Sequence, residues 1–127
     1  MFVGALKIDL LVLESRSLKE KRMIVRRIKD RARQRLGLTV VEVGALELWQ
    51  RAELGVAVTA QERGQVQALL DDVWRSVTTT EGVELLHASR DIAPFIGEAL
   101  DPPPPRAPDD SSWIPEEWRA SLDEESP

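Results

Sequence analysis

Between Phe2 and Ile92 the apolar residues follow two spacings in turn, and the order of these spacings limits the possible folds more than any other feature of the chain. In residues 2–13 every second position is apolar, as in a β-strand with one buried face. From Leu18 to about Leu36 the spacing becomes three or four residues, which is typical of an amphipathic helix. The apolar stripe of this helix comprises Leu18, Ile24, Val25, Ile28, Ala32 and Leu36.

Two capping boxes mark the beginnings of two helices. Ser17-Leu18-Lys19-Glu20 predicts the start of the first, and Gly37 predicts its end because glycine readily takes the left-handed conformation there. Thr59-Ala60-Gln61-Glu62 predicts the start of the second. We expect the inward residues of the second helix to be Val66, Leu69, Leu70, Val73, Trp74 and Val77.

The remaining segments are predicted strands. Residues 39–49 and 52–58 lie too close together for a helical crossover, so they should form an antiparallel hairpin. Residues 83–92 form the last predicted strand, which Pro94 ends. The resulting order βαββαβ predicts an α+β, ferredoxin-like fold: a four-stranded antiparallel sheet with both helices on one face.

The predicted domain covers residues 1–96, and residues 97–127 differ from it in composition. This second segment contains four consecutive prolines at 102–105 and should form an acidic, mostly disordered tail. The chain of 127 residues has no cysteine, and its N-terminal apolar run is interrupted by Lys7 and Asp9. We therefore expect no signal peptide, no membrane span and a cytoplasmic protein.

Charge is distributed unevenly along the chain. Residues 16–35 hold ten Lys or Arg against two acids, a net charge of +8, whereas the whole chain has −5. Residues 98–127 hold two Arg against nine acids, a net charge of −7. This separation predicts an anionic partner, a contact between the two ends of the chain, or both.

On a helical wheel, five cations of the first helix fall within about 80° of one another on one flank of the apolar stripe. We call these residues the cation ladder: Lys19, Arg22, Arg26, Lys29 and Arg33. They favour contact with a phosphate backbone, assisted by Arg16 and Lys21. The alternatives are a solvated basic face, and contact with an acidic protein surface or with the tail. The tail could compete with RNA, or it could be only a solubilising appendage.

The sequence offers no recognisable reaction chemistry. His87 is the sole histidine and cysteine is absent, so we expect no metal, no cofactor and no enzymatic activity. Acylphosphatases share the predicted topology, but this chain contains no asparagine and lacks their glycine-rich loop, which leaves a phosphate-handling enzyme dependent on Arg16 as a remote alternative. The predicted strands carry only Phe2 and Trp49 as aromatic residues, so nucleic-acid contacts should depend on the backbone of structured RNA.

Other residues are candidates for contacts with proteins. Trp49 and Arg51 could anchor a partner at the hairpin, although we favour Trp49 packed beneath the turn and Arg51 paired with Glu53. Trp113 and Trp118 could do so in the tail. Gly55 and Ala57 leave one face of the sheet low, which would suit a homodimer.

Three stretches of sequence resemble the YlxP-like family of small bacterial proteins, a domain of unknown function. They are Met1-Phe2-Val3-Gly4, Ser17-Leu18-Lys19-Glu20-Lys21-Arg22 and Trp49-Gln50-Arg51-Ala52-Glu53-Leu54-Gly55-Val56-Ala57-Val58. The resemblance covers about residues 1–93 and implies a ferredoxin-like domain. It also implies a gene often placed beside those of translation and ribosome-maturation factors, but it assigns no catalytic residues. We therefore expect a non-enzymatic, RNA- or ribosome-associated accessory protein, with a protein-interaction adaptor as the alternative.

Overall fold

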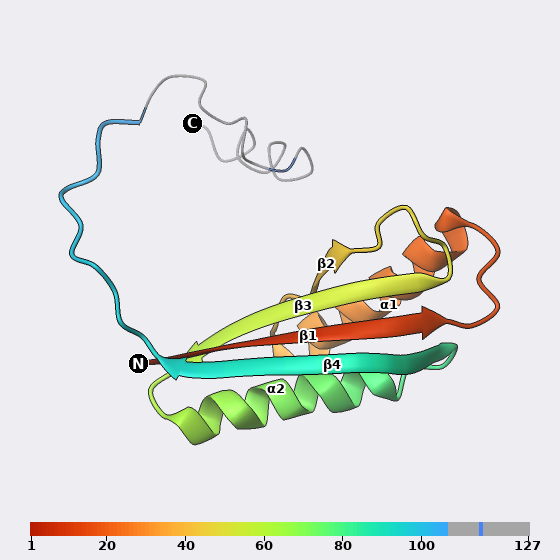
Figure 1. Ribbon diagram of the computed structural model, residues 1–127, viewed down its shortest axis with the longest axis horizontal. Helices are drawn as coiled ribbons and strands as arrows, with labels where there is room; N and C mark the ends of the chain where they lie inside the picture. Colours follow the sequence, from red (N-terminus) through yellow and green to blue (C-terminus); the bar gives the residue numbers. More distant parts are fainter. Residues whose placement is uncertain (107–114, 116–127) are drawn as a thin grey trace. The chain divides into compact units, whose positions relative to one another are not determined.

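The computed structural model describes residues 1–106 and 115, and residues 1–96 form one compact unit. The elements are β1 (Phe2–Val12), α1 (Leu18–Leu36), β2 (Val41–Gly44), β3 (Arg51–Ala60), α2 (Arg63–Thr78) and β4 (Val83–Pro94). The four strands form one antiparallel sheet in the order β2-β3-β1-β4. Both helices lie on the same side of this sheet (Figure 1), which confirms the ferredoxin-like fold.

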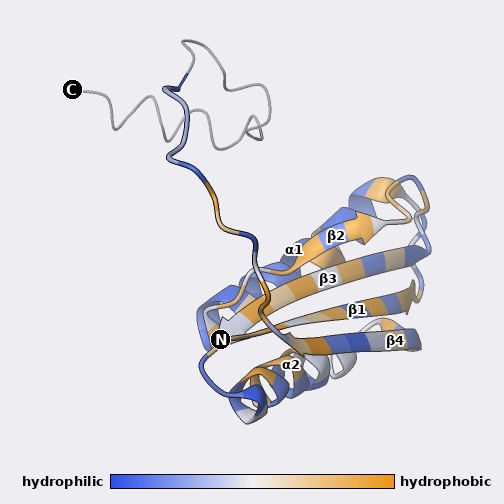
Figure 2. Cartoon of the chain, turned by 60° about the vertical axis from the view of Figure 1, so that its left-hand side comes forward, coloured by the Kyte–Doolittle hydropathy of each residue, from blue (hydrophilic) through white to orange (hydrophobic). Residues whose placement is uncertain are grey.

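The alternating sequence of β1 and β3 gives the sheet two different faces. Leu6, Ile8 and Leu10 of β1 are buried beneath the helices, while the residues between them lie on the opposite, open face. Figure 2 shows the corresponding change between hydrophobic and hydrophilic positions along these strands. Gly4 allows β1 to approach α2 closely, because a Cβ atom at this position would overlap with Cγ1 of Val66.

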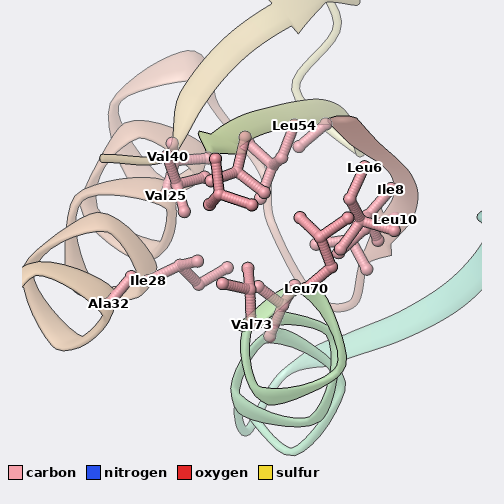
Figure 3. Packing of buried hydrophobic residues seen from close by; sticks show 14 of the residues in the cluster. Leu6, Ile8, Leu10, Val25, Ile28, Ala32, Val40, Leu54, Leu70 and Val73 are labelled. Atoms are coloured by element: carbon pink, nitrogen blue, oxygen red, sulfur yellow. The ribbon is translucent and has the colours of Figure 1, made fainter. Parts of the chain in front are cut away.

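The core lies between the sheet and the helices (Figure 3). Helix α1 contributes Val25, Ile28 and Ala32 to it, and α2 contributes residues such as Leu70 and Val73. Most of the predicted inward residues of α2 are indeed buried, but Trp74 is 40% exposed. Its ring lines a small hollow beside the edge strand β4, where the sheet ends and cannot cover it fully.

The structure corrects two predicted boundaries. Strand β2 is only four residues long and stops at Gly44, since Ala45 has a φ of 55° and its carbonyl accepts a 3.0 Å hydrogen bond from the Leu48 amide in a turn. Helix α2 begins later than predicted. Its capping box is formed by Glu62 and Gln65 and not by Thr59 and Glu62. Thr59 belongs to β3 instead, and its hydroxyl donates to the Phe2 carbonyl at 2.9 Å.

Candidate nucleic-acid interface

Local hydrogen bonds fix both ends of α1. The Ser17 hydroxyl accepts a 3.1 Å hydrogen bond from the Glu20 amide, as the predicted capping box requires. The Glu20 carboxylate accepts from the amide of Arg16 rather than from that of Ser17, which draws the preceding loop against the first turn. At the other end, Gly37 has a φ of 67°, and its amide donates to the Arg33 carbonyl at 3.0 Å.

Burial of one side of α1 determines which flank faces solvent. The deeply buried side chains Val25, Ile28 and Ala32 point toward the sheet and α2. On one flank, Arg31 and Arg35 line a shallow groove of about 370 Å³ together with residues of α2. The ladder lies on the other flank, so it faces away from α2 along the outer side of the helical layer.

Four members of the cation ladder, Lys19, Arg22, Arg26 and Arg33, are exposed, and Lys29 is half-buried. Within residues 1–106 and 115, no carboxylate lies within 4.0 Å of any of the five charged groups. Side chains three or four residues apart lie about 5 Å apart along the helix axis and carry the same charge, so they repel one another. The described residues thus leave five adjacent cations unneutralised on a rigid helix. Arg16, the predicted assistant, is also exposed.

Lys21 was expected to assist the ladder, and the structure corrects this expectation. Its side chain is 1% exposed, and its Nζ lies 2.8 Å from Oε2 of Glu42 in β2. The same ammonium donates to the carbonyls of Ala45 at 2.8 Å and Leu46 at 3.3 Å. The ion pair and both hydrogen bonds of this ammonium are made inside the protein, so Lys21 is not available to a phosphate.

The burial of Lys21 could have been predicted from its position in the sequence. It lies four residues before Val25 and seven before Ile28, which places it in the middle of the apolar stripe. A lysine there must be buried or must break the stripe. Its actual partners come from β2 and the following loop, so only the tertiary structure identifies them.

The candidate protein-binding residues occupy different places. Trp49 lies in the loop between β2 and β3 and is 42% exposed, so the expectation that it packs beneath a turn is wrong. Arg51 is exposed at the start of β3. Glu53 lies 3.9 Å from Nζ of Lys7 instead of pairing with Arg51. Trp113 and Trp118 lie outside the described residues.

Neither a membrane-spanning segment nor a metal site is found in the described part of the chain. No described helix combines the length and the apolar composition that crossing a bilayer requires. Within the same residues, no group of three or more His, Asp or Glu side chains is arranged to hold a metal ion. His87 is exposed on β4, with Asp9 of β1 as its pairing partner.

The ferredoxin-like topology and the basic α1 define a small α+β protein with an electropositive helical flank, and comparison with known proteins gives its family. The chain belongs to the family "Protein of unknown function (DUF503)", whose model matches residues 3–90. It is 28% identical over 89 residues to the "Uncharacterized protein YlxP" of Bacillus subtilis (strain 168). The match covers 62% of this chain and 97% of the Bacillus protein.

A solved structure similar to this chain is a de novo designed protein, LFR1, with a ferredoxin fold. It has a TM-score of 0.43 and 12% sequence identity, and the match covers 80% of this chain and 93% of the designed chain.

Proposed function

We propose that this protein is a non-enzymatic, cytoplasmic accessory protein that binds structured RNA or a ribosomal subunit through the outer flank of α1. The observation that carries the proposal is the cation ladder, with its five like charges and no described carboxylate within ion-pair distance. Neighbouring cations without nearby carboxylates repel one another and slightly disfavour folding. Binding of a polyanionic partner would remove this repulsion and explains why the row is present. The implied neighbourhood of genes for translation factors, drawn from the family resemblance, agrees with RNA as the partner.

The chemistry of the ladder suits a phosphate backbone. Arg22, Arg26 and Arg33 can each donate two parallel hydrogen bonds to one phosphate. Lys19 extends the row toward the N-terminal end of the helix, and Lys29 lies between Arg26 and Arg33. Because all five project from one helix, their relative positions are set before binding, which reduces the entropy lost in the complex.

The sheet supports recognition of backbone shape over recognition of bases. Single-stranded RNA binders with this topology stack bases on aromatic residues of the sheet. The described strands contain no Tyr or Trp, and their one Phe, Phe2, packs against the core on the helix side, which leaves His87 as the single exposed aromatic ring on these strands. Contacts with phosphates and with the shape of a duplex or folded RNA therefore agree best with these residues.

The proposal is tested by two triple variants on opposite flanks of one helix. Replacing Arg22, Arg26 and Arg33 by Ala should weaken binding to ribosomal subunits or structured RNA by at least about 100-fold near 50 mM salt. Replacing Arg27, Arg31 and Arg35 by Ala removes the same charge from the flank nearer α2 and should weaken binding much less. Equal affinity of both variants and the wild type, measured by filter binding or fluorescence anisotropy, would contradict the proposal.

A protein-interaction adaptor is the second candidate. It is favoured by the loop between β2 and β3, where Leu46, Leu48 and Trp49 are 55%, 49% and 42% exposed. In the adaptor hypothesis the open sheet face or the tail tryptophans Trp113 and Trp118 provide further contacts. Affinity capture from cell extract with the wild type and with a Trp49→Ala variant distinguishes the two functions, because RNA binding by the ladder should survive this change.

A further inference from the structure

One half of the open face of the sheet is largely apolar. In this half, near the start of β1, a trough of about 620 Å³ has a floor and one wall of Ala5, Val41, Val43, Gly55 and Ala57, while Lys7, Arg90 and Asp91 also line it. Val41 and Val43 are 46% and 51% exposed. The solvated face of an antiparallel sheet normally carries polar side chains at such positions. This part of the surface is therefore suited to being covered by another protein surface.

The trough has a specific shape because the side chain of Val43 lies over a glycine. A Cβ atom at Gly55 would lie 3.0 Å from Cγ1 of Val43, so the valine rests directly above the glycine backbone. The adjacent Ala5 and Ala57 are paired across β1 and β3 and rise little above the sheet. A flat centre flanked by a valine ridge can receive a similar surface with small side chains.

The other half of the open face has hydrogen-bonding groups that the described residues leave unmatched. Asp9 pairs with Glu53 on one side and His87 on the other. Its side chain is only 15% exposed, and its buried Oδ1 accepts no hydrogen bond from the described residues, with Nζ of Lys7 3.7 Å away. Glu53 shares the same lysine at 3.9 Å. Two neighbouring carboxylates thus depend on one half-exposed cation, which leaves acceptors in excess.

A donor in excess occurs on the same face. Arg51 alternates with the buried Ala52, so its side chain lies on the open side, where it is exposed. Within residues 1–106 and 115, no carboxylate lies within 4.0 Å of its guanidinium group. One surface therefore contains the unpaired guanidinium group of Arg51 and the carboxylates of Asp9 and Glu53, which share a single cation. A two-fold symmetric contact requires such a self-complementary arrangement of charges.

We infer that the open face of the sheet binds the same face of a second copy of this chain. The apolar trough forms the centre of the contact, and Arg51 of each copy supplies the donor that Asp9 and Glu53 of the other lack. Three strands of ten to twelve residues give a face of roughly 500 Å² in projection. The accessible surface of such a face is larger than its projection, so it approaches the roughly 800 Å² per partner of a stable interface. This inference is independent of the proposed RNA binding, because the helices lie on the other side of the sheet.

The first test is the mass of the full chain in solution. Sedimentation equilibrium should give about twice the monomer mass of 14.3 kDa. Ala57→Arg places a charge in the trough at an exposed position and should raise the dimer dissociation constant by at least about 100-fold. Gln67→Arg adds the same charge on an exposed position of α2 and should leave the constant unchanged. A monomeric wild type, or equal dimerisation of all three proteins, would overturn the inference.

The absence of cysteine allows a second test that does not depend on disrupting the contact. A single thiol introduced by Ala57→Cys should react with a maleimide at least tenfold more slowly at high protein concentration than at low concentration. The thiol of a Gln67→Cys variant should react at one rate throughout. If the Ala57→Cys thiol were protected only after cell extract is added, the face would belong to a different protein and self-association would be refuted. The Arg22, Arg26 and Arg33 variant should remain dimeric, so failure of either proposal can be recognised separately.

Discussion

Nζ of Lys21 lies 2.8 Å from Oε2 of Glu42, which joins the first turns of α1 to the short edge strand β2. The lysine side chain is 1% exposed and the glutamate side chain 13% exposed, so water screens the pair little. The two loop carbonyls bound by the same ammonium extend the link to the residues that follow β2. A single buried cation therefore holds together the helix, the edge strand and the loop that carries Trp49.

Removing this cation should destabilise the fold. Lys21→Met keeps most of the side-chain volume but leaves the Glu42 carboxylate without its cation and two carbonyls without their donor. We expect a loss of about 3–5 kcal/mol in the free energy of unfolding, measured by urea denaturation. Combining it with Glu42→Leu should recover part of the loss, because no buried charge is then unpaired. A change below about 1 kcal/mol for the single variant would show that the pair contributes little.

A comparison of Lys21 with Arg22 separates structural from binding roles among the basic residues of α1. At temperatures well below its melting temperature, the Lys21→Met protein should bind RNA nearly as the wild type does. Arg22→Met, one residue further along the helix and exposed, should reduce RNA affinity while changing stability by less than about 0.5 kcal/mol. The reverse pattern, in affinity and denaturation measured side by side, would contradict the assignment of the two residues.

Salt dependence should report the number of phosphate contacts. Five contacts with a duplex predict that log K falls against log salt with a slope of roughly −4 to −5. With Arg22, Arg26 and Arg33 replaced by Ala, about two contacts remain and the slope should fall to about −2. Binding titrations from 50 to 200 mM salt would measure both slopes. An unchanged slope would mean that these arginines do not touch phosphate.

Removing the acidic tail should strengthen RNA binding if the tail competes for the ladder. Residues 98–127 have a net charge of −7, close in size to the +8 of residues 16–35. A chain ending at residue 97 retains the whole compact unit of residues 1–96. We expect it to bind RNA several-fold more tightly than the full chain at low salt, with the difference lost at high salt. Equal affinities at low salt would leave the tail with a role other than competition.

Two glycines should respond in opposite ways to the same substitution. Gly4→Ala forces a methyl group toward Val66 and Leu70, and we expect a destabilisation of about 1–3 kcal/mol. Gly64 lies in the first turn of α2 with no neighbouring atom within 4 Å of a new Cβ. Gly64→Ala should therefore stabilise the protein by up to about 1 kcal/mol. Thermal unfolding of the two variants compares them directly.

The main features of the fold could be predicted because they depend on local periodicity. The alternation in β1, the stripe of α1, and Ser17 and Gly37 at the ends of that helix each act within a few residues of themselves. The predicted second strand was too long because no Asn-Gly or Asp-Gly pair marks the turn after Gly44. The turn at Ala45 instead relies on hydrogen bonds from Leu48 and from the distant Lys21.

The candidate sites could be predicted only in part, for the same physical reason. The positions of the ladder residues could be predicted from a helical wheel, since the sequence of a helix determines which of its flanks is exposed. The low open face was visible from Gly55 and Ala57, but the valines above it and the unmatched oxygen of Asp9 depend on the neighbours of β1 and β3 in the sheet. Pairing across strands therefore had to be known before this surface could be described.

Placing both helices on one side of the sheet has a consequence for assembly. Two molecules joined through their bare sheets would turn their basic helices in opposite directions, outward from the particle. Such a dimer would bind two separate segments of a folded transcript at once and bring them close together. A monomer, with a single basic side, would bind only one of these segments.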